Sequence, residues 1–148
     1  MEFDVKIGAT KERVVTTNSN QTISFLWKGE NVLSTPSMIS EMEETCRLLL
    51  KDFVLKGKEW DSVGTIVDIK HIAITPVGSK IRLKAIIESV NNRRVLFNVE
   101  AFDDIEKIGE GKHERYIINV AKFKSKFEEK KGKLDVNNDI NYINRVKL

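Results

Sequence analysis

The chain contains 148 residues, of which 41% are hydrophobic, and it carries a modest net charge of +3. This size favours one domain with a substantial core. No apolar run approaches the roughly 20 residues of a membrane-spanning helix, and the acidic start is unlike a signal peptide, so we expect a cytoplasmic protein with no membrane partner. Cys46 is the only cysteine, which excludes an intrachain disulfide and a cysteine-based zinc site, and we expect no metal.

The first part of the chain contains one strong helix signal. A short strand is expected over residues 13–17, followed by an irregular segment that leads to Ser34-Thr35-Pro36. A Thr side chain can cap a helix, and Pro at the first helical position loses no hydrogen bond. The helix is therefore predicted to begin here, with Thr35 as its cap, and to run to about Asp52.

This helix is amphipathic, with one acidic residue beside its apolar face. At about 100° per residue, seven apolar side chains fall within an arc about 120° wide. They are Met38, Ile39, Met42, Cys46, Leu49, Leu50 and Phe53. Glu43 lies about 20° beyond the edge of this arc. It is the charged residue of the helix nearest the core, and therefore a candidate for chemistry.

After the helix, the hydrophobic pattern changes to a period of two, which is typical of strands. We predict long antiparallel strands over residues 65–75, 79–90, 93–103 and 113–123, arranged as a meander. One helix followed by such a sheet indicates an α+β domain in which the sheet wraps the helix. The exposed edge of a small sheet is often covered by a second copy, so we expect a homodimer, with a dimer of dimers as a further option.

The C-terminal tail differs in composition from the rest of the chain. Residues 124–148 carry seven Lys or Arg and four Asp or Glu, so the excess charge lies there and the body is close to neutral. We expect a domain over residues 1–127 and a charged tail, disordered or loosely docked, over 128–148. A DNA-binding protein would normally show a basic helix or stripe on its folded body, so no nucleic-acid partner is expected.

Three polar residues lie on surfaces that should face inward. In the first long strand, His71 alternates with Ile69 and Ala73 and therefore points toward the apolar side. Taken singly, a buried His71, a helix-flank Glu43 and a capping Thr35 each have an ordinary structural explanation. The combination of a hydroxyl, a carboxylate and an imidazole is what favours a catalytic set.

Five separated elements carry a family resemblance. They are Thr35-Pro36, Glu43, Val63-Gly64, His71 and Gly111-Lys112-His113-Glu114-Arg115. This order resembles the fluoroacetyl-CoA thioesterase-like family of hotdog-fold thioesterases, whose pattern is a Ser-Thr-Pro helix start, a later Glu, a Val-Gly, a strand His and a late Gly-x-His-x-Arg. The similarity covers roughly residues 3–127 and leaves only the tail outside.

The resemblance implies a hotdog fold and an acyl-CoA thioesterase that hydrolyses a short or medium acyl-CoA thioester to a carboxylic acid and coenzyme A. The positions that match the family's catalytic residues are Thr35, Glu43 and His71. Gly64 matches the glycine that lines the acyl site, and His113 and Arg115 match a supporting motif, either structural or near the bound thioester. A dimer with active sites at the subunit interface is implied too. No cofactor is expected, because coenzyme A is part of the substrate.

Other functions are also consistent with the sequence. A non-catalytic acyl-CoA-binding or ligand-sensing hotdog domain would keep the pocket, but it would not need Glu43 and His71. A related hotdog hydratase would be expected to carry an Asp and a His in a different arrangement, and Asp68 lies on the strand face opposite His71. For a thioesterase, the choice between base and nucleophile for Glu43 stays open.

Overall fold

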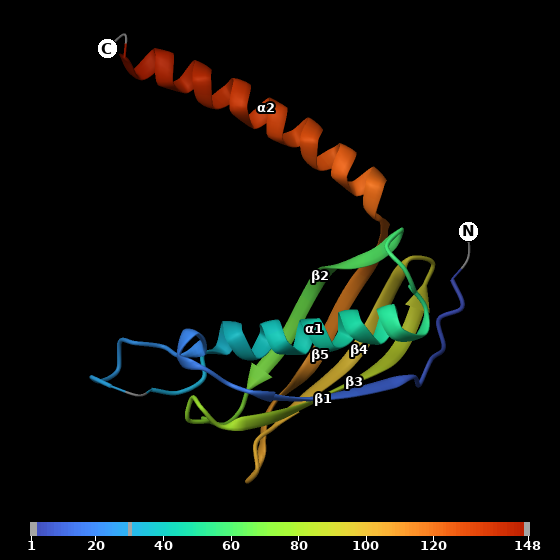
Figure 1. The fold of residues 1–148 in the computed structure, drawn as a ribbon, viewed down its shortest axis with the longest axis vertical. Coiled ribbons are helices and arrows are strands. Elements are labelled where there is room, and N and C mark those ends of the chain that lie inside the picture. The colour runs from blue at the N-terminus through green and yellow to red at the C-terminus, as the bar shows by residue number, and fades with distance from the viewer. Residues whose placement is uncertain (1–2, 30, 147–148) are drawn as a thin grey trace.

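The computed structural model describes residues 3–29 and 31–146, with side chains as far as residue 135. Its elements, in chain order, are β1 (Thr10–Thr16), a short 3₁₀ helix (Ser19–Gln21), α1 (Thr35–Phe53), β2 (Trp60–His71), β3 (Lys80–Asn91), β4 (Arg94–Phe102), β5 (Lys107–Asn119) and α2 (Val120–Val146). Figure 1 shows α1 lying across one face of the sheet, as the α+β prediction requires. No helix in the described ranges is both long and apolar enough to cross a membrane.

The five strands form one antiparallel sheet in the order β1-β3-β4-β5-β2. The predicted meander is correct for β3, β4 and β5, but it is wrong for β2, which pairs with β5 at the far edge of the sheet. Alternation identifies a strand without identifying its neighbour, because any strand can pair on either side. The sheet therefore has two edges, β1 and β2.

Several strand boundaries also differ from the prediction: β1 spans residues 10–16 and not 13–17, β2 ends at His71 and not at residue 75, and β5 begins at Lys107 and not at residue 113. β2 also begins at Trp60, before the predicted residue 65, and β5 ends at Asn119, before the predicted residue 123. These two ends pair with each other, and the backbone N–H of Val120 then donates to the Glu59 carbonyl at 2.9 Å. Past this point the chain has left the sheet and begins α2.

The buried face of α1 holds the fold together. The predicted arc is confirmed for Met38, Met42, Cys46, Leu49 and Leu50, all fully buried. They pack into one cluster with apolar residues from β3, β4 and β5, among them Leu83, Ile87, Phe97, Val99 and Ile117. Burying each large side chain stabilises the fold by about 1.5–3 kcal/mol. Phe53 was predicted on this face but is 61% exposed, because it is the last residue of the helix.

The cap of α1 is Ser34, and the prediction of Thr35 as the cap is wrong. The Ser34 hydroxyl accepts the backbone N–H of Ser37 at 3.2 Å, and Thr35 and Pro36 occupy the first two helical positions. The two hydroxyl residues are adjacent in sequence, so either could have capped the helix. The consequence is that the Thr35 hydroxyl is available for another contact.

The chain ends in a long second helix. Figure 1 shows α2 leaving the body at the corner where β2 begins and extending away from the sheet. The tail predicted over residues 128–148 lies within this helix as far as Val146, and residues 147–148 lie outside the described part.

Candidate active site

The start of α1 and the end of β2 bring Thr35 and His71 together. Oγ1 of Thr35 lies 2.8 Å from Nδ1 of His71, within hydrogen-bond distance. Burial lowers the pKa of His71 below its usual 6.5, against an opposing effect of the Ala73 backbone, so the imidazole is neutral at pH 7. Its buried Nε2 has no hydrogen-bond partner among the described residues.

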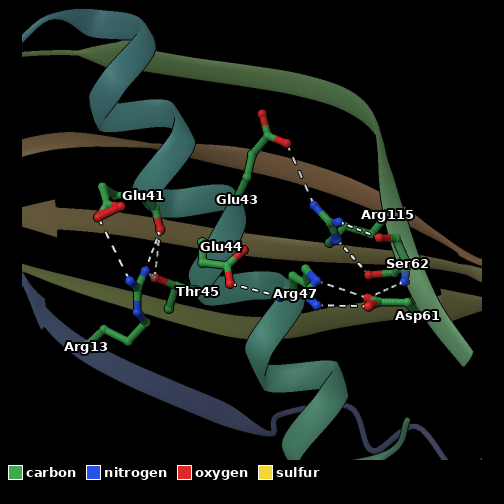
Figure 2. A network of polar contacts seen from close by, with 9 residues as sticks. All are labelled: Arg13, Glu41, Glu43, Glu44, Thr45, Arg47, Asp61, Ser62 and Arg115. Atoms are coloured by element: carbon green, nitrogen blue, oxygen red, sulfur yellow. Dashed lines mark hydrogen bonds and ion pairs between the residues drawn. The ribbon is translucent and has the colours of Figure 1, made fainter. Parts of the chain in front are cut away.

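Glu43 approaches the sheet about two turns further along α1, as Figure 2 shows. Its Oε2 lies 3.7 Å from Nη1 of Arg115 and 3.9 Å from Nε2 of His113, and the side chain keeps 35% of its exposure. A Cβ atom on Gly64 would lie only 3.0 Å from the same carboxylate oxygen. The absence of a side chain at Gly64 is therefore what lets the carboxylate come this close to β2.

Arg115 lies almost completely buried beneath Glu43, and its guanidinium group is held on three sides. Nε donates to the Ser62 hydroxyl at 2.7 Å, Nη2 donates to the Ser62 carbonyl at 2.7 Å, and Nη1 donates to Nε2 of His113 at 3.1 Å. Burial lowers the pKa of Arg115, although a guanidinium stays charged in proteins. A buried positive charge needs a counter-charge, and Glu43 supplies one.

His113 is fully buried and neutral. Its Nδ1 lies 2.8 Å from the carbonyl of Ile66, which can only accept, so this nitrogen carries the proton. Its Nε2 must then accept from Arg115, which can only donate. Burial and the neighbouring guanidinium lower its pKa, while the Ile66 carbonyl acts in the opposite direction. The contact between His113 and Glu43 is therefore not an ion pair at pH 7.

A second ion-pair cluster fastens α1 to the start of β2, next to Glu43. Arg47 lies 2.9 Å from Glu44 on its own helix and 2.9 Å from Asp61 on the strand (Figure 2). Asp61 directly precedes Ser62, the residue that holds Arg115. The Arg47–Asp61 ion pair therefore joins α1, which carries Glu43, to β2, the strand that the Glu43 carboxylate faces.

The sequence pattern did not point to Asp61 or Ser62 as part of the site. A signal was nevertheless present, because Ser62 and Gly64 alternate on β2 while His113 and Arg115 alternate on β5. The pairing of Gly64 with Arg115 places these residues side by side on one face. Small and polar residues where core residues are expected mark a place where something other than the core must fit.

Thr35 and His71 form one group, and Glu43, Gly64, His113 and Arg115 form another. Eight residues separate Thr35 from Glu43 on α1, which is about 12 Å along the helix and about 80° around it. No hydrogen bond or ion pair joins the two groups within residues 3–29 and 31–135. In the same part of the chain, no cluster of three His, Cys, Asp or Glu is placed to hold a metal ion.

Comparisons with known proteins agree on one family. A family model described as fluoroacetyl-CoA-specific thioesterase matches residues 15–121. A fluoroacetyl-CoA thioesterase from Streptantibioticus cattleyicolor is 34% identical over 99 residues, which span 67% of this chain and 70% of that protein. The solved structure of the fluoroacetyl-CoA thioesterase FlK superposes with a TM-score of 0.77 at 27% identity, covering 85% of this chain and 97% of that one. A thioesterase superfamily member from Thermus thermophilus has a TM-score of 0.78 at 24% identity, covering 88% and 96%, and so shares the fold.

A helix wrapped by a five-stranded antiparallel sheet, matched to these relatives, defines a hotdog-fold thioester hydrolase. The chain belongs to the family described as fluoroacetyl-CoA-specific thioesterases. The resemblance that the sequence showed and the hotdog fold that it implied are both confirmed.

Proposed function

We propose that this protein is an acyl-CoA thioesterase that hydrolyses a short or medium acyl-CoA thioester to a carboxylic acid and coenzyme A. Family membership supports the reaction class. The observation that carries the proposal is the carboxylate of Glu43, partly exposed and held over Gly64 by the buried Arg115. We propose no further cofactor, since coenzyme A enters as part of the substrate.

Glu43 is the proposed catalytic carboxylate, and two reactions are open to it. As a base, it takes a proton from water while the water oxygen bonds to the thioester carbon and the carbon–sulfur bond breaks. As a nucleophile, it attacks the carbon itself and forms an anhydride, which water then hydrolyses. Hydrolysis in ¹⁸O-labelled water tests the second route. ¹⁸O found in the Glu43 carboxylate by mass spectrometry of the peptide would establish an anhydride that water opens at the Glu43 carbon, because a base never takes up a water oxygen.

The Thr35–His71 pair is the proposed hydrogen-bond donor to the negative charge that develops during the reaction. If Thr35 donates to Nδ1 of His71, the proton on Nε2 remains free; if Nδ1 donates to Thr35, the hydroxyl proton remains free. In both tautomers one donor is left for the developing oxyanion or for the departing thiolate. A neutral imidazole suits this role, because it can stabilise negative charge by hydrogen bonding without losing its proton.

Gly64 is proposed to line the acyl site, and His113 and Arg115 are proposed to support it. His113 is fully buried and Arg115 is 5% exposed, so neither side chain is open to a ligand. Their contact with Glu43 favours the structural form of the supporting role over direct contact with the thioester. Arg115 is thus a positioning residue, which acts on the substrate through Glu43.

A homodimer, or a dimer of dimers, is the proposed assembly. β2 is an edge of the sheet, and Ile66 and Val67 on it are exposed. Two β2 edges that pair antiparallel would cover these residues and continue the sheet. Because Thr35 and Glu43 lie about 12 Å apart along one helix, a second copy could also bring one protomer's His71 closer to its partner's Glu43.

The first test is thiol release from a panel of acyl-CoA thioesters, from acetyl to octanoyl. The wild-type protein should turn over at least one of them, and Glu43→Gln should lose about 10²- to 10⁴-fold in rate, as expected for an acid–base group. Glu44→Gln is the matched control, because Glu44 pairs with Arg47 and not with Arg115. Glu43→Gln with wild-type turnover would reject the assignment. Binding of the thioesters without turnover, read as a thermal shift, would indicate a ligand-sensing domain instead.

A further inference from the structure

Helix α2 carries an apolar stripe that faces solvent. Its members are Val120, Phe123, Phe127 and Leu134, each at least 39% exposed. At about 100° per residue they fall within an arc about 60° wide. The helix surface around them is rich in lysine, with Lys122, Lys124, Lys126, Lys130, Lys131 and Lys133. Two phenylalanines and a leucine aligned on one helix face are normally packed against another surface.

The position of α2 points to where that surface lies. The Val120 N–H donates to the Glu59 carbonyl, so the helix starts beside the first residue of β2. Figure 1 shows it extending from that corner away from the sheet, on the side of β2 and not of β1. β2 pairs only with β5 within the described chain, so α2 extends on the side of the unpaired edge.

Exposed apolar and acidic residues, which complement the apolar and basic residues of α2, lie at the opposite end of β2. Ile72, Ile74 and Ile105 are 47%, 75% and 87% exposed. Ile105 lies in the β4–β5 hairpin, which is next to the end of β2 because His71 pairs with Gly109. The same hairpin exposes Asp104 and Glu106. An apolar surface bordered by carboxylates is what a lysine-flanked apolar stripe would fit.

Antiparallel pairing of two β2 strands brings these two surfaces together. A twofold axis near the middle of β2 places the first residue of one strand beside the last residue of the other. The start of α2 then lies next to the partner's Ile72. Within a single chain the two surfaces are at opposite ends of β2.

We propose that α2 is an arm that docks on a second copy of this chain. Its apolar stripe covers the partner's Ile72, Ile74 and Ile105, and its lysines face the partner's Asp104 and Glu106. This inference rests on the homodimer included in the proposed function. It does not depend on the reaction, because no catalytic residue takes part in the contact.

Sedimentation velocity over a dilution series of the full chain tests the arm. The variant Phe123→Ser/Phe127→Ser should raise the dimer dissociation constant by up to about 10⁴-fold, because each half-exposed ring that becomes buried is worth about a factor of ten and the two arms of a symmetric dimer bury four such rings. Ala121→Ser/Glu129→Ser introduces serine on the opposite side of the same helix and should leave the constant unchanged. Asp104→Asn/Glu106→Gln should raise it by a smaller factor, and added salt should reduce that difference.

Three results would overturn the proposal. The stripe variant could dissociate like wild type, or the intact chain could be monomeric at every concentration. The third is a result with vesicles of equal parts phosphatidylserine and phosphatidylcholine. If the wild-type protein sediments with these vesicles and the stripe variant does not, while both have the same dimer dissociation constant, the stripe binds an anionic membrane instead. Sedimentation measures dimerisation and not thioester hydrolysis, so the two proposals can fail separately. If the protein dimerised through α2 but hydrolysed no thioester, the proposed reaction would be rejected and the proposed docking of α2 would stand.

Discussion

The centre of the candidate site is one half-exposed carboxylate above one buried guanidinium. Glu43 Oε2 and Arg115 Nη1 are 3.7 Å apart, and Arg115 is anchored to Ser62 and His113. Removing one partner of a buried charge pair is costly, because the charge left behind has no compensation. The pair therefore links the stability of this corner of the fold to the position of Glu43.

Arg115→Met should lower kcat for thioester turnover with little change in KM. The reason is that the Glu43 carboxylate loses the guanidinium that holds it over Gly64, while the groups that bind the substrate are unchanged. Arg115→Lys keeps the charge but not the fork-shaped geometry, so it should restore kcat only in part. Arg94→Met is the control, since Arg94 pairs with Glu114 near the surface. An unchanged kcat in a folded Arg115→Met variant would mean that Arg115 only supports the fold.

The two histidines predict how stability depends on pH. Both have a pKa lowered below 6.5 in the folded state, His71 by burial and His113 by burial and Arg115. The unfolded chain takes up these protons first as the pH falls below about 6.5, so the free energy of unfolding should decrease there and be fully present above it. Each histidine contributes a slope of up to about 1.4 kcal/mol per pH unit.

Urea unfolding at a series of pH values from 5 to 8 measures this slope. His113→Gln can still accept from Arg115 but does not titrate. The free energy of unfolding of this variant should therefore depend less steeply on pH between the folded and unfolded pKa of His113, by the contribution of about one proton. Equal slopes in the variant and the wild type would contradict the assignment of a neutral, buried His113.

At the scale of elements, two adjacent residues at the start of α1 have different roles, one in helix stability and one in the candidate site. Ser34 caps the helix, while Thr35 contacts His71. Ser34→Ala should therefore reduce the free energy of unfolding by about 1 kcal/mol and leave turnover close to wild type. Thr35→Ala should lower turnover and leave the free energy of unfolding unchanged or slightly higher, because alanine is the better helix former and only the contact to His71 is lost.

Both variants can be measured by urea unfolding and by thiol release on the same preparations. If Thr35→Ala lowered stability and left turnover intact, the hydroxyl would be a structural group and the proposed donor pair would have to be abandoned.

At the scale of the whole molecule, the hydrophobic core lies between the sheet and α1. Phe97 on β4 is fully buried in that core, whereas Phe53 at the end of α1 is 61% exposed. Phe97→Ala should cost about 3–5 kcal/mol, a large part of the stability of a small domain, and Phe53→Ala should cost little. Thermal and urea unfolding by circular dichroism test the pair, and a similar loss in both would place the core elsewhere.

Much of this protein could be read from its sequence because the signals are local. The period of the apolar residues in α1 predicted a buried face that includes Met42 and Leu49, and the structure buries both. The spacing of Thr35, Glu43, Gly64 and His71 predicted the family, since a motif spread over several elements is difficult to match by chance. The long strands and the α+β class followed from a change of period.

Other features were decided only by the tertiary structure, because they depend on which elements are neighbours. The pairing of β2 with β5 put Gly64 beside Arg115 and created the support beneath Glu43, although these residues are far apart in the chain. Ser34 and not Thr35 caps the helix, and the Thr35 hydroxyl instead lies 2.8 Å from Nδ1 of His71, a contact that only the fold brings about. The period of a sequence pattern predicts which way a side chain points. Burial, strand pairing and the protonation state of a buried histidine depend instead on the residues that lie opposite, and only the folded chain determines which residues these are.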